Sequence, residues 1–181
     1  MKKIFAILAL AVSASAFADS ATVELGNVNN IGSADQSQVK LAVSHTFNQT
    51  YAGDVSITNT QTDGTNALGT RLEAGVTTSA PVGPVTGYVR TALGSKYSNT
   101  SQFAYYSVEP GIKFPVGPVT AQIGYRYRSA TDSTLNGDQT HTARVGVSYA
   151  LSKVDTVGIR FDRVRGDNVQ NVTALNYSRG F

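Results

Sequence analysis

The chain has 181 residues, no cysteine and a formal net charge of +3. Without cysteine there is neither a lipid-modified N-terminal cysteine nor a disulfide-stabilised secreted domain. The charge gives no indication of nucleic-acid binding, because 13 Lys plus Arg would face 12 Asp plus Glu after loss of the leader described next.

The first 18 residues have the layout of a cleaved secretory signal peptide. Two lysines precede an apolar stretch, Ile4–Val12, and small residues end in Ala16-Phe17-Ala18. A transmembrane anchor would need about 18 apolar residues, and two serines interrupt this stretch earlier. We therefore expect a signal peptide over 1–18 and a single mature domain over 19–181, with no helical span.

The mature part alternates apolar and polar residues as β-strands do. Val119–Arg128 is apolar or aromatic at every odd position and polar or Gly at every even one. About ten such segments follow one another, and boundary error leaves roughly eight to twelve strands possible. The segments are 20–28, 37–47, 52–61, 67–80, 85–97, 102–114, 119–130, 139–151, 155–165 and 169–181.

The connections between these segments alternate in length, as they do in an outer-membrane barrel. Short turns are expected at 48–51, 81–84, 115–118 and 152–153, and longer polar loops at 29–36, 61–66, 96–101, 130–138 and 165–168. Pro-Val-Gly-Pro-Val-Thr occurs at Pro81–Thr86 and again at Pro115–Thr120, which indicates a reused hairpin turn. An even strand count would return both termini to the periplasm.

Charge separates the two faces of the expected strands. Only helices and closed barrels satisfy the backbone within lipid, so the sequence predicts an all-β, antiparallel, up-and-down transmembrane β-barrel. A soluble sandwich or lipocalin-like barrel, with its apolar face inward, is the alternative. The polar face holds eight basic and five acidic residues, namely Glu24, Lys40, Asp54, Arg71, Glu73, Arg90, Glu109, Lys113, Arg126, Arg128, Arg144, Arg160 and Asp162.

Aromatic residues on the apolar face gather at two heights, as they do at membrane interfaces. The expected girdle at the turn end is Phe47, Phe114, Tyr149 and Phe181, and the girdle at the loop end is Tyr97, Tyr106, Tyr125, Tyr127 and Phe161.

The signal peptide, the alternating strands and the ending Thr173–Phe181 resemble small bacterial outer-membrane barrels of the OmpA/OmpX type and monomeric porins. The resemblance implies a monomer in the Gram-negative outer membrane, in contact with its lipid and lipopolysaccharide. It also implies an assembly signal read by the barrel assembly machinery, formed here by Leu175, Tyr177 and Phe181. Arg179 departs from that pattern, and it is expected to snorkel to the interface.

The inward charges are expected to form a structural network rather than isolated sites. The predicted network is Glu24, Lys40, Arg71, Glu73, Arg90, Glu109, Lys113, Arg126, Arg128, Arg144, Arg160 and Asp162. With the Pro-Gly turns as hairpin centres, Arg90 is expected opposite Gly75 and diagonal to Glu73, and Arg126 opposite Ser107 and diagonal to Glu109. Arg144 is expected directly across from Asp162.

From this network we expect a structural barrel or a narrow, low-conductance pore. A barrel of about ten strands is little wider than one filled by its own side chains. The alternative is a monomeric porin for small solutes, anionic by preference because basic residues predominate.

The sequence leaves two other functions as alternatives. A lipid A-modifying enzyme would need a base, but His45 and His141 are both expected to face outward. We expect no enzyme, no cofactor and no metal site. A surface adhesin is suggested by Arg165-Gly166-Asp167, although this is also ordinary turn chemistry. The segment 132–138 lacks calcium-loop spacing.

Overall fold

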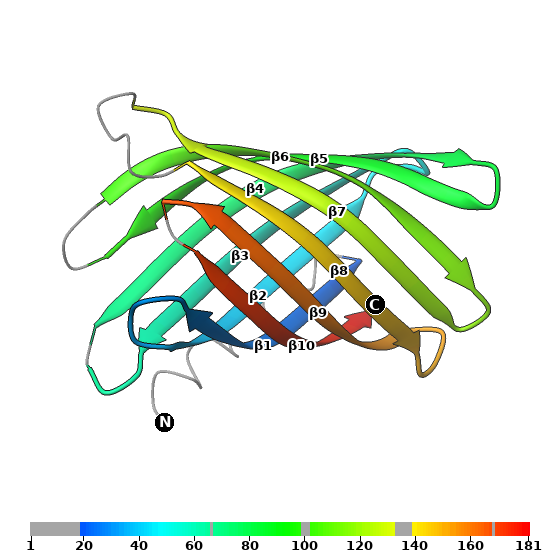
Figure 1. Ribbon diagram of the computed structural model, residues 1–181. Coiled ribbons are helices and arrows are strands. Elements are labelled where there is room, and N and C mark those ends of the chain that lie inside the picture. Colours follow the sequence, from blue (N-terminus) through cyan, green and yellow to red (C-terminus); the bar gives the residue numbers. More distant parts are fainter. Residues whose placement is uncertain (1–18, 66, 99–101, 133–138, 168) are drawn as a thin grey trace.

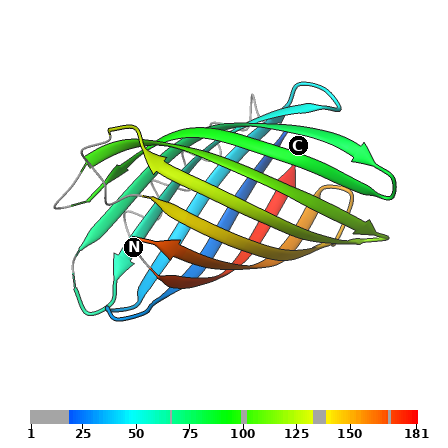
Figure 2. The same ribbon diagram turned by 45° about the horizontal axis from the view of Figure 1, so that its top comes forward.

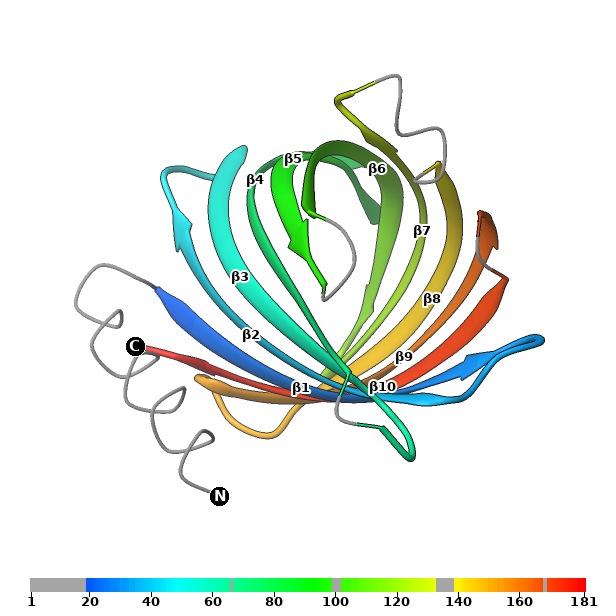
Figure 3. The same cartoon turned by 90° about the vertical axis from the view of Figure 1, so that its left-hand side faces the viewer.

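The computed structural model describes residues 19–65, 67–98, 102–132, 139–167 and 169–181. These residues form ten antiparallel strands in one closed barrel, each strand paired with its neighbours in sequence and the first with the last (Figures 1 and 3). The strands are β1 (Ser20–Asn30), β2 (Gln36–Thr46), β3 (Tyr51–Thr62), β4 (Leu68–Val82), β5 (Val85–Tyr97), β6 (Gln102–Val116), β7 (Val119–Ala130), β8 (Thr140–Ala150), β9 (Asp155–Gly166) and β10 (Gln170–Gly180).

This architecture confirms the predicted all-β, up-and-down barrel of ten strands. Each predicted strand boundary lies within two residues of the observed one. Within the described ranges, no helix has the length and hydropathy needed to cross a membrane. The predicted signal peptide, 1–18, lies outside the described residues.

The wall of the barrel is apolar outside and charged inside. Leu93 and Ile123 point outward and are 68% and 54% exposed, whereas the inward carboxylates of Glu73 and Glu109 belong to residues only 6% and 3% exposed. A soluble barrel has the opposite arrangement, so that alternative is wrong. An apolar exterior around a polar interior is the arrangement of a transmembrane β-barrel.

The two ends of the barrel differ, and Figure 2 shows the tilted strands running between them. We call the end with connections 47–50, 83–84, 117–118 and 151–154 the turn side, and the opposite end the loop side. Ser20 pairs with Gly180, so the two ends of the described chain meet at the turn side.

The two Pro-Val-Gly-Pro repeats form tight hairpins. Val82 pairs with Val85 and Val116 with Val119, so the turn residues are Gly-Pro in both cases. Gly83 and Gly117 have φ angles of +62° and +59°, a conformation that only glycine adopts without strain.

This turn position corrects two predicted pairings. Arg90 lies opposite Thr77 rather than Gly75, and Arg128 rather than Arg126 lies opposite Ser107. The prediction centred each turn one residue too early, on Val-Gly, and every pairing in the hairpin moved by two residues. Arg144 does lie opposite Asp162, as predicted.

Candidate functional site: the charged lumen

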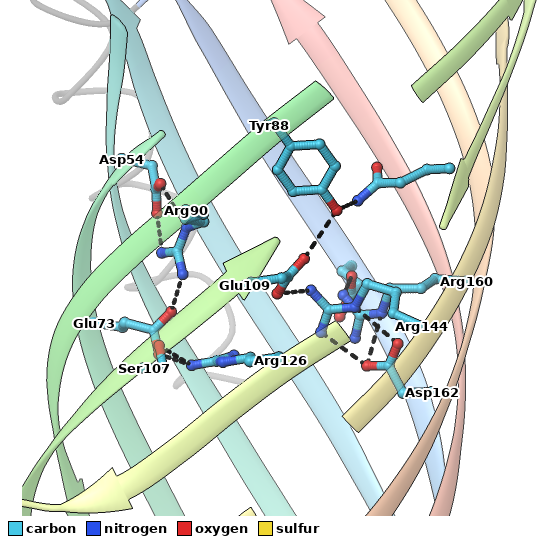
Figure 4. Close-up of polar contacts among 12 residues, drawn as sticks. Asp54, Glu73, Tyr88, Arg90, Ser107, Glu109, Arg126, Arg144, Arg160 and Asp162 are labelled. Atoms are coloured by element: carbon cyan, nitrogen blue, oxygen red, sulfur yellow. Dashed lines mark hydrogen bonds and ion pairs between the residues drawn. The ribbon is translucent and has the colours of Figure 1, made fainter. Parts of the chain in front are cut away.

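Two clusters of charged side chains lie in the middle of the lumen (Figure 4). The Glu73 cluster comprises Asp54, Glu73, Arg90 and Arg126, from β3, β4, β5 and β7. The Asp162 cluster comprises Glu24, Glu109, Arg144, Arg160 and Asp162, from β1, β6, β8 and β9. Every member lies on the inward face, because the side chains of each strand point alternately into the lumen and to the exterior.

In the Glu73 cluster, one carboxylate accepts hydrogen bonds from two guanidinium groups. Arg90 donates from Nη1 to Glu73 Oε1 at 2.7 Å, and it makes a bidentate pair with Asp54 at 2.9 and 2.5 Å. Arg126 donates to the second oxygen of Glu73 and, at 3.1 Å, to Ser107. Tyr105, which is fully buried, also donates to Glu73 at 2.8 Å. Both oxygens of this buried carboxylate thus accept from donors, two of which are cationic.

The Asp162 cluster is built in the same way. Arg144 makes a bidentate pair with Asp162 at 2.9 and 3.0 Å and donates to Glu109 at 2.7 Å. Arg160 donates to Glu24 at 2.6 Å, and its Nε lies 3.2 Å from Asp162. This chain of charges runs around the lumen from β1 to β6.

Small residues allow the arginines to reach across a whole strand. Gly75, on β4, lies between Asp54 and Arg90, and a Cβ there would be 2.6 Å from the Arg90 guanidinium. Arg144 reaches Glu109 over Gly124 of β7, which lies opposite it in the register. The clusters therefore link second-neighbour strands as well as adjacent ones.

Tyr88 lies in the lumen beside Glu109. Its hydroxyl donates to Glu109 at 3.2 Å and accepts from Gln122 Nε2 at 2.6 Å. The Lys113 ammonium lies 5.4 Å from the centre of its ring. Tyr88 is 6% exposed, so its ring is almost wholly covered by its neighbours.

The tyrosine fits because Gly111 has no side chain. A Cβ at Gly111 would lie 2.4 Å from Tyr88 Cζ. We expect Gly111→Ala to lower the free energy of unfolding by about 1–3 kcal/mol, the usual cost of overpacking. Urea unfolding followed by far-ultraviolet circular dichroism measures this.

The control for that prediction is Gly87→Ala, whose new Cβ would meet nothing closer than 3.6 Å. In a Tyr88→Ala background the cost of Gly111→Ala should largely vanish. An equal cost in both backgrounds would contradict the steric explanation.

Of the twelve residues predicted as a network, the structure brings eight together in the two clusters. The other four also lie on inward positions: Arg71, Lys113 and Arg128 are on β4, β6 and β7, which contribute to the clusters, and Lys40 is on β2, which does not. Arg128 lies 5.2 Å from the ring of Tyr105. Among the described residues, no carboxylate is within ion-pair distance of Lys40 or Arg71. These two cations therefore take no part in the ion pairs of the two clusters.

Sequence reasoning missed several lumen residues. Asp54 was assigned to the polar face but left out of the network, although it holds Arg90. The predicted network also omits Tyr88 and Tyr105. Each lies two positions before a predicted inward residue, Arg90 and Ser107 respectively. The alternation of side chains along each strand is therefore sufficient to place both tyrosines in the lumen.

A cavity of about 490 Å³ opens from the loop side down to the clusters. We call it the vestibule. The charged side chains that line it are seven basic and two acidic, namely Lys40, Arg71, Lys96, Arg126, Arg128, Arg144 and Arg160 with Glu24 and Asp162. Nε of Arg126 is buried and has no acceptor among the described residues. The vestibule is therefore a basic, polar chamber.

The two histidines lie on the outside of the barrel at opposite ends. His45 Nδ1 is 3.1 Å from Asp19 Oδ1 on the turn side, and His141 Nδ1 is 2.7 Å from the Tyr125 hydroxyl on the loop side. The backbone N–H of Thr46 holds the pKa of Asp19 below its usual value. The described contacts of either ring include no serine or threonine hydroxyl, so this part of the chain shows no nucleophile and base pair.

The predicted girdle residues face outward at the two expected heights. Phe47, Tyr149 and Phe181 are exposed on the turn side, with Phe114 partly exposed beside them. Tyr97, Tyr106, Tyr125 and Phe161 are exposed toward the loop side, and Tyr127 packs edge-on against Tyr106. Leu175, Tyr177 and Phe181 of the predicted assembly signal also face outward. The role of these residues in the membrane stays a prediction.

The remaining motifs have local contacts. Arg179 lies 3.5 Å from Asp155. The Asp167 carboxylate accepts from the backbone N–H of Gln139, which ties the Arg165-Gly166-Asp167 tripeptide to β8. Most of the segment 132–138 lies outside the described residues. Among the described residues, no group of three metal-ligating side chains occurs.

No protein-family model matches the chain, and no curated protein matches its sequence. Many solved structures match the chain in fold, among them two structures of one porin. One is the KdgM porin, with 13% identity and a TM-score of 0.52 over 88% of this chain and 99% of that one. The other is the KdgM porin in complex with disordered oligogalacturonate, with 11% identity and a TM-score of 0.50 over 90% and 99%. The likeness shows the fold, that of an outer-membrane β-barrel.

Proposed function

We propose that this chain is an integral protein of the Gram-negative outer membrane, acting as a structural barrel or a narrow, low-conductance pore. The single observation that carries this proposal is the pair of charge clusters at mid-height. Glu24, Glu73, Glu109 and Asp162 are all at most 6% exposed, although they face the lumen. Side chains rather than water fill that level.

Four further features support the location. The exterior is apolar, the aromatic residues lie at two heights, the C-terminal residue is an outward phenylalanine, and the chain begins with a signal-peptide pattern. By the usual asymmetry of such barrels, the turn side faces the periplasm and the loop side the exterior. The proposed partners are outer-membrane lipid, lipopolysaccharide and the barrel assembly machinery, and the proposed state is a monomer. We assign no catalytic role.

A second candidate is a monomeric porin for small anionic solutes, favoured by one observation. The vestibule has seven basic side chains against two acidic ones, and a cavity lined by one sign of charge concentrates the opposite ion. One structure of similar fold, the KdgM porin, was solved with an oligogalacturonate, an anionic sugar oligomer. Here the clusters would have to rearrange for an oligomer to pass.

Single-channel recording of the refolded chain in planar bilayers separates the two candidates. We expect conductance steps far below those of water-filled porins with roughly 16–18 strands. Any residual current should prefer chloride over potassium. Large, steady steps would reject the closed lumen and favour the porin. An unboiled sample that migrates differently from a boiled one on a denaturing gel shows that the barrel has refolded.

A further inference from the structure

Two arginines point away from the lumen at the loop end of β9. Arg163 and Arg165 alternate with the inward residues Asp162 and Val164, which are 6% and 7% exposed. They are therefore on the outer wall of the barrel, unlike the arginines of the two clusters.

Neighbouring strands add two polar side chains beside them. His141 of β8 lies opposite Arg165, and Asn171 of β10 lies opposite Arg163. Directly opposed side chains in an antiparallel pair are close enough to act on one group. We call Arg163, Arg165, His141 and Asn171 the outward basic patch.

The height of the patch coincides with the edge of the apolar exterior. On β9 the outward residues before it are Val157, Ile159 and Phe161, and Phe161 is 52% exposed. After Phe161 the same face continues with Arg163 and Arg165. The patch therefore lies where acyl chains give way to lipid headgroups on the loop side.

The charge of the patch is not neutralised by the part of the chain that the structure describes. Arg163 donates to the neutral amide oxygen of Asn171 at 2.7 Å. Asp167, the nearest acid in sequence to Arg165, has its carboxylate directed at the backbone of Gln139. No described carboxylate lies within ion-pair distance of either guanidinium group. At the turn side, by contrast, the outward Arg179 is paired with Asp155 at 3.5 Å.

We propose that the outward basic patch binds the phosphate group of an anionic lipid in the leaflet that meets the loop side. Guanidinium groups match phosphate oxygens in geometry and charge, and two on one face can hold one phosphate. The occupant is a lipid because the patch adjoins the apolar exterior, where the acyl chains of the same molecule would pack. This inference rests on the proposed membrane location but is independent of conduction.

Lipid A in phosphatidylcholine nanodiscs is the probe. The refolded full chain should retain lipid A in preference to phosphatidylcholine, counted by native mass spectrometry. Arg163→Gln with Arg165→Gln should lower that preference by about fivefold per arginine, since a basic side chain near an anionic surface contributes about 1 kcal/mol. Arg179→Gln is the matched control and should leave the preference unchanged.

The outcomes are distinguishable. Insertion of the wild-type chain without any preference for lipid A would overturn the patch alone. An equal loss in Arg179→Gln would reduce the effect to overall charge and overturn it too. Failure of the refolded wild-type chain to insert would overturn the membrane proposal instead. Single-channel currents of the double variant should match those of the wild type, because neither arginine faces the lumen.

Discussion

Replacing Glu73 by glutamine is expected to lower the free energy of unfolding by about 3–5 kcal/mol, the cost of leaving a buried charge without its partner. The substitution keeps the shape of the side chain and removes its charge. Arg90 retains Asp54, but Arg126 loses its carboxylate partner and keeps only neutral acceptors, the amide oxygen of the new glutamine and the hydroxyl of Ser107. The Arg126 guanidinium would then be an uncompensated cation in the middle of the barrel.

Urea titration in detergent micelles, read by the gel mobility of unboiled samples, measures this loss. Asp63→Asn is the matched control, because Asp63 is an exposed loop carboxylate that, among the described residues, accepts a single 3.4 Å bond, from Ser37; its effect should stay within about 0.5 kcal/mol. The double variant Glu73→Gln with Arg126→Gln should cost less than the sum of the single variants. Additive losses, or a cost for Glu73→Gln no larger than the control's, would contradict a coupled cluster.

The alternation of apolar and polar residues was sufficient to predict the strands, their faces and the barrel. In a strand the side-chain period is two, so each charged residue on the polar face is assigned to the lumen as soon as the face is known. The pairing of Arg144 with Asp162 also followed, because the turn between β8 and β9 was centred correctly.

The contacts of the lumen could not be predicted in the same way. Sequence reasoning pairs adjacent strands, whereas Arg90 reaches Asp54 and Arg144 reaches Glu109 across an intervening strand. Such contacts depend on the inward curvature of a closed barrel, which brings second-neighbour side chains together. They also depend on glycine in the strand between, and nothing in the periodicity distinguishes a glycine that admits an arginine from any other.

The hairpin error has a different cause. Proline cannot donate to a ladder, which suggested that Pro81 and Pro115 end their strands. In the structure each pairs with a threonine, Thr86 or Thr120, at the last positions before the turn. At a strand end, the backbone N–H that proline lacks costs the ladder little stability. The position of the turn is therefore set by the glycine with positive φ and not by the proline, and at such repeats the strand register is predicted from the glycine.

Glycine and tyrosine together explain how two aromatic rings fit into the lumen. Gly94 and Gly111 leave the space that the rings of Tyr105 and Tyr88 occupy, since a Cβ at either position would lie 2.4 Å from a ring carbon. The two tyrosine hydroxyls then donate to Glu73 and Glu109, one in each cluster. Aromatic bulk and paired charge thus occupy the middle of the lumen, and the basic vestibule opens from there toward the loop side.

Neutralising Arg71 and Lys40 is expected to reduce the chloride preference of any residual current by at least about fivefold. Both side chains line the vestibule, and neither is paired with a described carboxylate. A unit charge about 8 Å from a permeating ion contributes roughly 0.5–2 kcal/mol at effective dielectric constants between water and the protein surface. Because they are surplus to the clusters, Arg71→Gln and Lys40→Gln should change selectivity without the loss of stability expected for Glu73→Gln.

Reversal potentials in a potassium chloride gradient measure this preference. Lys153→Gln serves as the control, since Lys153 is an exposed residue of the turn-side connection and lies outside the vestibule. The difference between wild type and the double variant should shrink as ionic strength rises, because the screening length falls from about 10 Å at 0.1 M salt to about 3 Å at 1 M. If the double variant kept the full chloride preference at low salt, Arg71 and Lys40 would not set the ion selectivity, and the charge that does would have to lie on other basic side chains of the lumen.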